Sequence, residues 1–327
     1  MALARVMALR GRRRPDLFVA ASQLTETNSA LLAALRRRDV AAEWLPPDAI
    51  DSRLAPGDVV LSRLDVCETL DGVEAGTWQL CRAQQAGVTV LNETSALLRS
   101  HDKLATALAL ADACLPHPRT AQVGEPGADP PLPVPVVVKP RFGSWGKDVF
   151  ACESPTEYER CLRRLRDRSW FRYHGALVQE LVPPRGHDLR VLVACGSVVG
   201  AVERHARPGE WRTNVALGAR RVPATPDQRA IDLALAATKA VGGDLVGIDL
   251  LPIADGDYVV LEVNAAVDFT REYSLDGRRV FDDVAEILAA ACSRPAADDA
   301  LLAASGSPAS RPPAVLVSEE AASSRGG

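Results

Sequence analysis

The chain has 327 residues, of which 47% are hydrophobic and 24% charged, and its formal net charge is -4. This composition is typical of a folded protein with room for two or three modest domains. The negative balance excludes a strongly basic protein that binds nucleic acid through its overall charge. No segment approaches 18 uninterrupted apolar residues, so we predict no membrane span.

The N-terminal segment and the cysteines indicate where the protein is located. The N-terminal apolar run ends in arginines, whereas a secretory signal has its charges before a longer apolar core. The seven cysteines are scattered and form no Cys-x-x-Cys pair, which favours reduced thiols over a zinc site or a disulfide scaffold. We therefore expect a cytoplasmic protein.

Predicted strands and helices alternate over residues 16–92. Strands are expected at 16–22, 41–46, 57–66 and 88–92, with helices at 27–39 and 72–87. Thr27 or Asn28 is expected near the first helix N-cap, and the second helix ends at a glycine. This alternation favours a small parallel sheet flanked by helices. A dinucleotide site is not supported, because no Gly-x-Gly-x-x-Gly follows the first strand.

The second half of the chain is richer in strands. One long helix is expected over about 95–114, and the Pro/Gly-rich segment 123–135 marks a boundary. Strands then dominate as far as a hairpin at 247–264, with helices expected near 155–168 and around 280–292. We predict domains at 15–94, 95–182 and 183–292, and a disordered tail at 293–327 that is rich in Ala, Ser and Pro.

The hairpin at 247–264 has a strong turn signal. Asp255-Gly256 lies between two apolar runs, a pattern that predicts a two-residue turn. Ala254 would then pair with Asp257.

In that register two carboxylates meet. Asp249 faces Glu262 directly, and Asn264 lies on the same face because side chains repeat every two residues. Like charges directly opposite each other destabilise a sheet. A divalent cation bound by these hard oxygen ligands, Mg²⁺ or Mn²⁺, would resolve the repulsion. The alternative is an ordinary solvated face of an antiparallel sheet.

A glycine loop follows the strand that ends in Lys139. Gly143, Ser144 and Gly146 leave backbone N–H groups free to contact phosphate oxygens, and the lysine adds a point charge. The loop is not a Walker A motif, because the Gly-Lys-Ser/Thr ending is absent. An ordinary turn beside a surface lysine is the alternative interpretation.

Arginines are concentrated between Glu203 and Arg221, where five arginines face two glutamates. Guanidinium groups bind carboxylates and phosphates through two hydrogen bonds. Arg190 and Arg204 lie within apolar strands, which favours a binding role for them over a solvated strand face. The chain has no Gly-x-Ser-x-Gly elbow, so covalent serine catalysis has no support.

Taken in order, seven segments resemble the RimK-type carboxylate–amine ligases of the ATP-grasp superfamily. They are "HDKL", "VVVKPRFGSWGKDV", "VQELV", "DLRVLV", "AVERHARPGEWRTN", "GIDLL" and "LEVN". The resemblance spans 15–292. It implies an ATP-grasp fold of the α/β (α+β) class, with a small N-terminal parallel-sheet domain and two mixed subdomains that clamp ATP.

The resemblance also implies roles for single residues. Lys103 and Lys139 would hold the nucleotide phosphates under a flap at 143–146. Arg190 and Arg204 would face the reacting carboxyl group. Glu180 and Leu181 would be the hinge positions around adenine and ribose, with Asp188 as the nearby polar contact. The remaining positions would line the triphosphate site (Arg212, Thr213 and Asn214) and bind Mg²⁺ (Asp249, Glu262 and Asn264).

The implied reaction uses ATP and Mg²⁺ to join an acceptor carboxylate to an amino acid through an acyl phosphate. The acceptor would be a small carboxylate or the C-terminus of an acidic carrier protein or peptide, and we expect a homo-oligomer. A non-catalytic ATP-binding regulator and a kinase that stops at phosphoryl transfer are the alternatives.

Two departures bear on specificity. The "HRGG" of glutamate-adding members is replaced by "VALGAR", and "EVNAAVDFTREYS" is similar to the LysX/ArgX branch. Acceptor selectivity would then depend on Val267, Asp268, Phe269 and Arg271.

Overall fold

The computed structural model describes residues 14–125 and 129–292, and its strands form three sheets that follow one another along the chain. The first sheet is parallel throughout and its strand order is β2-β1-β3-β4, as the alternating pattern predicted. Its strands are β1 (Leu17–Ala20), β2 (Ala42–Leu45), β3 (Val59–Ser62) and β4 (Thr89–Leu91). The associated helices are α2 (Glu26–Arg36), α3 (Ile50–Arg53) and α4 (Thr77–Gln85), with a short 3-10 turn at Pro47–Ala49.

The second sheet is antiparallel and has the order β5-β8-β6-β7. Its strands are β5 (Thr120–Val123), β6 (Val136–Pro140), β7 (Phe150–Cys152) and β8 (Ala176–Glu180), and helices α7 (Pro155–Leu165) and α8 (Ser169–His174) follow β7. Val136 and Val138 pack with these helices in one apolar cluster. Lys139 lies on the opposite face, because successive side chains of a strand alternate.

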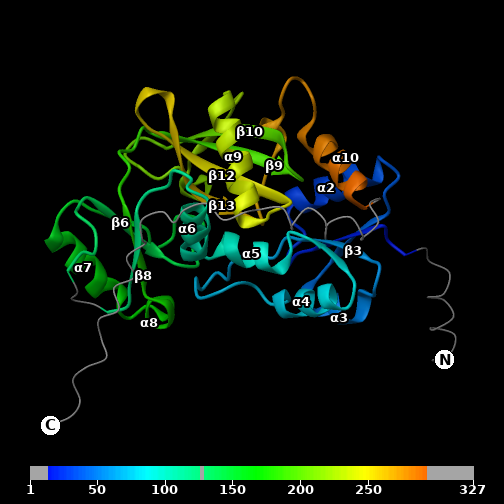
Figure 1. Ribbon diagram of the computed structural model, residues 1–327, viewed down its shortest axis with the longest axis horizontal. Coiled ribbons are helices and arrows are strands. Elements are labelled where there is room, and N and C mark those ends of the chain that lie inside the picture. The colour runs from blue at the N-terminus through cyan, green and yellow to red at the C-terminus, as the bar shows by residue number, and fades with distance from the viewer. Residues whose placement is uncertain (1–13, 126–128, 293–327) are drawn as a thin grey trace, which may run out of the picture.

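The third sheet is antiparallel and has the order β11-β10-β9-β12-β13. Its strands are β9 (His187–Ala194), β10 (Ser197–His205), β11 (Arg220–Pro223), β12 (Leu245–Pro252) and β13 (Tyr258–Asn264), with 3-10 turns at Val215–Leu217, Ala254–Gly256 and Arg271–Tyr273. One face packs through Leu189, Val191 and Val193 against helix α9 (Gln228–Val241). In Figure 1 this sheet lies between the first sheet and the second, which are at opposite ends of the molecule.

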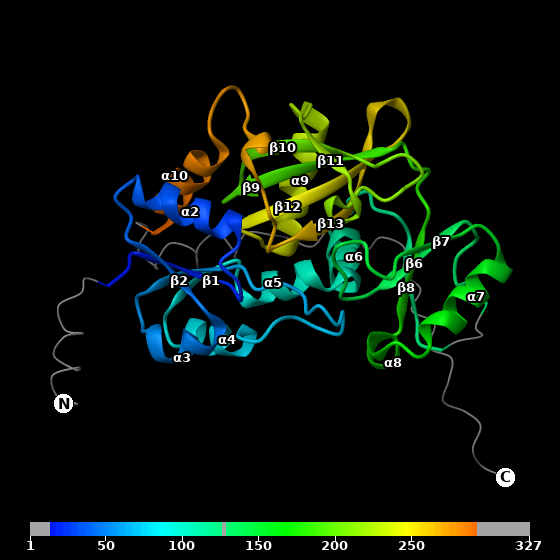
Figure 2. The same ribbon diagram turned by 180° about the vertical axis from the view of Figure 1, so that it is seen from behind.

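Helix α10 (Val280–Cys292) returns from the third sheet to the first domain. It lies beside α2, as the view from behind also shows (Figure 2). Arg37 and Arg38 on the α2 side form ion pairs with Asp282 and Glu286 of α10 at 2.6 and 2.8 Å. The predicted helix around 280–292 is thereby confirmed.

The helix expected over 95–114 is in fact two helices, α5 (Thr94–His101) and α6 (Lys103–Asp112). Asp102 separates them with an extended backbone, and its carboxylate caps α6 by accepting from the N–H groups of Leu104 and Ala105. Arg141 donates to both of its oxygens, at 2.7 and 2.5 Å. The apolar spacing hid this break, because an Asp can cap a helix without interrupting the hydrophobic pattern.

Two other local predictions need correction. The N-cap of α2 is Thr25, whose hydroxyl accepts from the N–H of Asn28, so Thr27 and Asn28 lie inside the helix. Helix α9 has no counterpart among the predicted elements, although Asp227 caps its N-terminus and Gly242 ends it in the left-handed conformation.

The hairpin of β12 and β13 keeps the predicted pairing at its centre but not at its turn. Ile253 donates to Asp257, so the loop has three residues, 254–256, and Ala254 does not pair with Asp257 as a ladder partner. A bulge at Leu261 restores the register beyond the turn. Asp249 therefore faces Glu262, as predicted, by a route that the turn signal did not contain.

Asn92, at the end of β4, joins the first sheet to the third. Its side-chain nitrogen donates to the carbonyl groups of Ser62, Leu245 and Ala265, at 3.3, 2.9 and 3.2 Å. Its side-chain oxygen accepts from the N–H groups of Asp244 and Leu245, at 2.8 and 3.0 Å. One buried amide thus fixes the ends of three strands from two sheets.

Within the described residues, no helix is long and apolar enough to cross a membrane. The rejected N-terminal signal lies largely, and the tail at 293–327 entirely, outside the described residues. The strands of the three sheets fall at 17–91, 120–180 and 187–264. The domain boundaries at 94 and 182 stay a prediction.

Candidate active site

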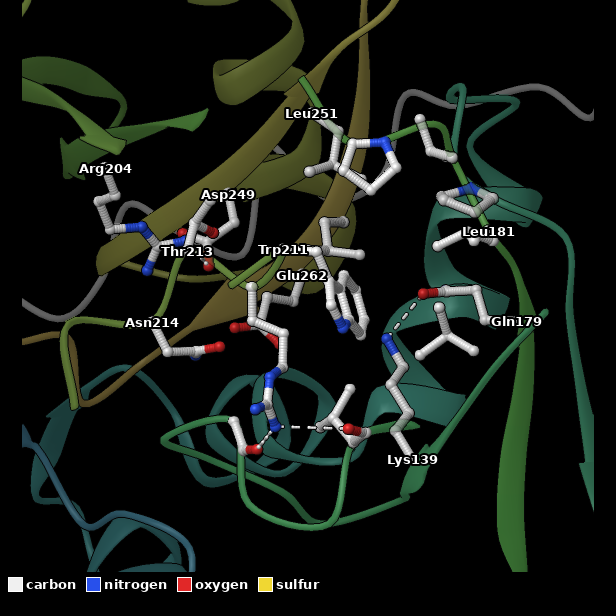
Figure 3. A pocket seen from close by; sticks show the side chains of 18 of the residues that line it. Lys139, Gln179, Leu181, Arg204, Trp211, Thr213, Asn214, Asp249, Leu251 and Glu262 are labelled. Carbon is white, nitrogen blue, oxygen red and sulfur yellow. Dashed lines mark hydrogen bonds and ion pairs between the residues drawn. The ribbon is translucent and has the colours of Figure 1, made fainter. Parts of the chain in front are cut away.

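A cleft with about 1000 Å³ of empty volume lies between the second and third sheets. Figure 3 shows side chains from both sheets pointing into it. Thirteen of the sixteen predicted site residues line this cleft: Lys103, Lys139, Gly143, Ser144, Gly146, Glu180, Leu181, Arg204, Arg212, Thr213, Asn214, Asp249 and Glu262. The fold therefore brings most of the predicted set together, whereas their individual roles stay predictions.

The charged face of the third sheet follows from the alternation of side chains along its strands. On β9, Leu189 and Val191 point to the core under α9, and Asp188 and Arg190 point the other way. The registers place Arg190 beside Asp249, which in turn faces Glu262 on β13. One face of the third sheet thus carries carboxylate and guanidinium groups on neighbouring strands.

The carboxylate of Asp249 is enclosed by two guanidinium groups. Arg190 donates to its two oxygens at 2.5 and 2.6 Å, and Arg204 donates at 2.8 Å. Asp249 is only 1% exposed, and a buried charge without such partners would be costly. The repulsion between Asp249 and Glu262 is therefore offset by cations that the chain itself supplies.

Asp188 does not reach the cleft. It is fully buried and binds Arg204 through both carboxylate oxygens, while Thr213 donates to it at 2.7 Å. In this arrangement Asp188 orients Arg204 and Thr213, and its role as a polar contact near the nucleotide stays a prediction.

Glu262 is paired from the helical side of the cleft. Lys103 Nζ lies 2.9 Å from one oxygen, and Arg190 lies 3.9 Å from the other. Burial alone would raise the pKa of Glu262, but the attraction of Lys103, Lys139 and Arg190 outweighs it and lowers the pKa below its ordinary value. Glu262 is therefore a carboxylate at any pH at which the protein functions.

Lys139 is buried and has no carboxylate partner within the part of the chain that the structure describes. Its Nζ donates to the side-chain oxygen of Gln179 at 2.7 Å, as the dashed line in Figure 3 marks. Burial and the repulsion from Lys103 lower the pKa of Lys139 to about 8. A cation held this way gains strongly from an incoming phosphate.

The glycine loop is fixed against both sides of the cleft. Lys103 donates to the carbonyl of Gly143 at 2.7 Å, and Arg212 donates to that of Gly146 at 2.9 Å. Arg212 is itself held by Glu210, whose pKa falls to about 2 because of that hydrogen bond. A Cβ at position 146 would approach Asn214 Oδ1 to 2.7 Å, so only glycine permits this close packing.

The other end of the cleft is apolar. Leu181 lies on the far side of the cleft from Arg204 in Figure 3, and Leu251, Pro252, Val137 and Trp211 also line the cleft. An elongated ligand with a flat apolar ring at one end and negative charge at the other matches this division. Glu180 is nearby, in a half-exposed ion pair with Arg119 at 3.0 Å.

A second cavity, with about 840 Å³ of empty volume, adjoins the charged end of the cleft. The two share Ser144, Arg204, Asn214 and Glu262 in their linings. The predicted residues Arg190 and Asn264 line this second cavity rather than the cleft. It also brings together side chains from four separate segments: Asp65, His101, Arg221 and Asp268.

Sequence reasoning assigned no role to Asp65, Gln179 or Trp211. Gln179 had a signal, since it alternates with apolar residues on β8, but Asp65 and Trp211 lie in irregular segments without any periodicity. Arg221 was counted in the arginine-rich segment and given no special weight.

The oxygen donors at Asp249, Glu262 and Asn264 fit a hard divalent cation. The described residues contain no group of three or more His, Cys, Asp or Glu side chains that could hold a metal alone. Two facing carboxylates and one amide, whose Nδ2 lies 3.5 Å from Glu262, form a partial set that suits an ion completed by water and phosphate oxygens. Among known proteins, residues 123–280 match the RimK-like ATP-grasp domain.

A probable alpha-L-glutamate ligase of Aeromonas salmonicida is 31% identical over 245 residues, which are 72% of this chain and 78% of that protein. This chain belongs to the RimK-like ATP-grasp family. It is an ATP-dependent ligase that joins a carboxylate to an amine, as its sequence predicted. The ligase names of its relatives favour this reading over the regulator and the kinase.

A further relative and a solved structure are also similar to this chain. The alpha-aminoadipate–LysW ligase LysX of Saccharolobus solfataricus is 30% identical over 196 residues, 57% of this chain and 69% of LysX. The ATP-grasp ligase PsnB, solved with a minimal precursor, Mg and ADP, superposes with a TM-score of 0.60 at 19% identity and covers 85% of this chain and 97% of its own. The ATP-grasp fold is thus shown, and the predicted α+β class is confirmed.

Proposed function

We propose that this ligase joins the amine of an amino acid to the carboxyl group of an anionic acceptor, such as the C-terminal glutamate of an acidic peptide or carrier protein. Mg²⁺, or Mn²⁺ in its place, would accompany ATP. The proposal rests on the chain's membership in a ligase family and on the charge of the cavity beside the nucleotide cleft.

The position of Arg221 is the observation that supports an anionic acceptor. It faces Arg204 across β10 and β11 and lines the second cavity. Its Nε is buried without a hydrogen-bond partner among the described residues, and its attraction to Glu272 is a minor cause of that residue's lowered pKa. Arg190 and Arg204 are satisfied by Asp188 and Asp249, so Arg221 is the guanidinium left for a carboxylate of the substrate.

The cleft supports the assignment of the nucleotide. Lys103 and Lys139 would contact the phosphates, the loop at 143–146 would cover them, and Leu181 would adjoin the base. Asp249, Glu262 and Asn264 would hold the metal, which supplies positive charge to the phosphate oxygens.

The chemistry then needs no protein nucleophile. A carboxylate oxygen of the acceptor attacks the γ-phosphorus of ATP, the bond to the β-phosphate oxygen breaks, and an acyl phosphate and ADP form. The amine nitrogen then attacks the acyl carbon and the carbon–oxygen bond to phosphate breaks, leaving an amide and inorganic phosphate. Arg204 and Arg190, which line the second cavity, would stabilise the negative charge that the acyl oxygen gains.

The segments around the second cavity favour an acceptor of the LysX type. Here "VALGAR" stands where glutamate-adding relatives have "HRGG", and Val267 and Asp268 after β13 line the cavity. Phe269 is fully buried, so it would shape the cavity wall only from behind. Arg271 is not among the residues that line the cavity.

We also propose that the enzyme works as a homo-oligomer in the cytoplasm. Light scattering of the purified protein tests its assembly, and a monomer at working concentration would contradict it.

An assay of paired substrates tests the main proposal. Purified protein is incubated with ATP, Mg²⁺, a synthetic peptide ending in glutamate and a mixture of the twenty L-amino acids, and the peptide is weighed by mass spectrometry. We expect ADP release that requires the peptide, and a peptide heavier by one amino-acid residue. ADP release that never depends on either substrate would contradict the proposal.

A further inference from the structure

One wall of the second cavity is acidic and comes from the first domain. Asp65 follows β3 in a tight loop, where its backbone N–H donates to Glu74 and its carbonyl accepts from the N–H of Glu74, both at 2.8 Å. The N–H of Val66 donates to Asp65 Oδ1 at 2.7 Å. No described residue donates to Oδ2, so this oxygen remains available within a rigid loop.

His101 lies beside Asp65 and is also part of this wall. It is only 6% exposed, and its Nε2 lies 2.8 Å from the carbonyl of Leu64. A carbonyl can only accept, so Nε2 carries the proton and Nδ1 carries a lone pair. Nδ1 points to Asp65 at 3.8 Å and has no hydrogen-bond partner among the described residues. His101 lines the cavity, so a donor on a bound ligand can complete the hydrogen bonding of Nδ1.

The charges around this wall make the carboxylate of Asp65 a better proton acceptor than an ordinary aspartate. Burial lowers the pKa of His101 to about 4, so the imidazole is neutral and does not offset Asp65. Burial, with repulsion from Glu74 and Asp268, raises the pKa of Asp65 to about 6, against a weaker attraction from Arg63. Arg63 lies nearer to Asp268, at 3.7 Å. At neutral pH Asp65 is therefore an ionised carboxylate that binds a proton readily.

The wall faces the place where the two substrates must meet. Glu262 lines the same cavity, and so do Arg190 and Arg221, whose charge is opposite to that of Asp65. Lys103 and Glu262 are close enough to His101 to affect its pKa. A cavity with guanidinium groups on one side and a carboxylate on another suits an acceptor anion facing an incoming ammonium.

We propose that Asp65, assisted by His101, binds the attacking amine and accepts its proton when the amide bond forms. This inference rests on the proposed ligase function. The amine arrives as an ammonium ion, held by Asp65 Oδ2 and in line with Nδ1 of His101. Asp65 takes one proton from the ammonium ion, which frees the nitrogen lone pair. The neutral amine then attacks the acyl carbon, the carbon–oxygen bond to phosphate breaks, and the second proton leaves the nitrogen with the departing phosphate. The proton on Asp65 passes to solvent.

Two amines of different basicity separate this role from a structural one. Hydroxylamine is largely unprotonated at neutral pH and needs no base to attack an acyl phosphate, whereas the amine of an amino acid is protonated. The glutamate-ended peptide, ATP and Mg²⁺ are supplied with either amine to the wild type, to Asp65→Asn and to Asp71→Asn. Asp71 lies on the same loop outside the cavity, so its variant is the matched control.

We expect Asp65→Asn to form hydroxamate at about the wild-type rate, because its cleft is unchanged. Its amide formation with amino acids should fall roughly 100-fold, the lower range for loss of a general base. Raising the pH should recover part of that loss, since more of the amine is then unprotonated. Asp71→Asn should resemble the wild type with both amines.

The outcomes are distinguishable. Equal losses with both amines would show a structural role for Asp65 and overturn the inference, as would unchanged amide formation. A wild type that forms neither hydroxamate nor amide would instead refute the proposed function, and the inference with it.

Discussion

The nucleotide cleft and the second cavity adjoin each other but differ in whether their charged groups have partners within the protein. In the cleft, Asp249 and Glu262 are each within 2.9 Å of a guanidinium or an ammonium group. In the second cavity, three atoms have no hydrogen-bond partner among the described residues: Arg221 Nε, Asp65 Oδ2 and His101 Nδ1. The paired set is held in place before any ligand binds, whereas the unpaired set would be completed only by substrates.

Removing one charge from the paired set should have the largest effect. Glu262→Gln keeps the shape but leaves Lys103 and Arg190 facing a neutral amide. We expect turnover to fall on the order of 1000-fold, the upper range for loss of one preorganised electrostatic contact. Because Lys103 already offsets the repulsion from Asp249, the change should not stabilise the fold.

Calorimetry of ATP binding with and without Mg²⁺ checks this prediction, alongside thermal unfolding. Asp257→Asn, on the exposed end of the same hairpin, is the control. A Glu262→Gln variant that retained Mg²⁺-dependent ATP binding would show that the carboxylate is not a metal ligand.

Removing a charge from the unpaired set should have a smaller and more selective effect. Arg221→Met should lower kcat/KM for the peptide acceptor roughly 10- to 150-fold, which corresponds to about 1.5–3 kcal/mol for one charged hydrogen bond. The affinity for ATP should not change. Arg220→Met, one residue away and exposed, provides the control. Equal losses in peptide and ATP binding would mean that the two regions are not separate.

A pH titration should reveal the smallest difference. Between pH about 8 and 10.5, the unfolded chain keeps a proton on Lys139 that the folded protein has lost, so this lysine makes folding more favourable as pH rises through that window. Phosphate binding needs the protonated form. We therefore expect affinity for an ATP analogue to fall by at most about tenfold per pH unit above 8. Lys139→Met should remove that dependence, and an unchanged pH profile would contradict the lowered pKa.

The sequence predicted what local patterns and motifs encode. The first sheet follows from the alternation of strands and helices, and most residues of the cleft follow from the family resemblance. The facing of Asp249 and Glu262 was predicted from a two-residue turn, whereas the structure reaches it through a three-residue loop and a bulge at Leu261. The break at Asp102 and the helix α9 were missed, because capping and small apolar residues change periodicity little. The Asp65 and His101 wall of the second cavity could not be predicted, since Asp65, His101 and Asp268 are far apart in sequence and come together only in the folded chain.

Asn92 has a consequence for how the enzyme opens. Its five hydrogen bonds tie β3 to the ends of β12 and β13, so Asp65 and Glu262 belong to a single rigid block. The second sheet is attached to that block without a comparable clamp among the described residues. We therefore expect admission of nucleotide and release of ADP to require movement of the second sheet, while the spacing between Asp65 and Glu262 stays constant through the catalytic cycle.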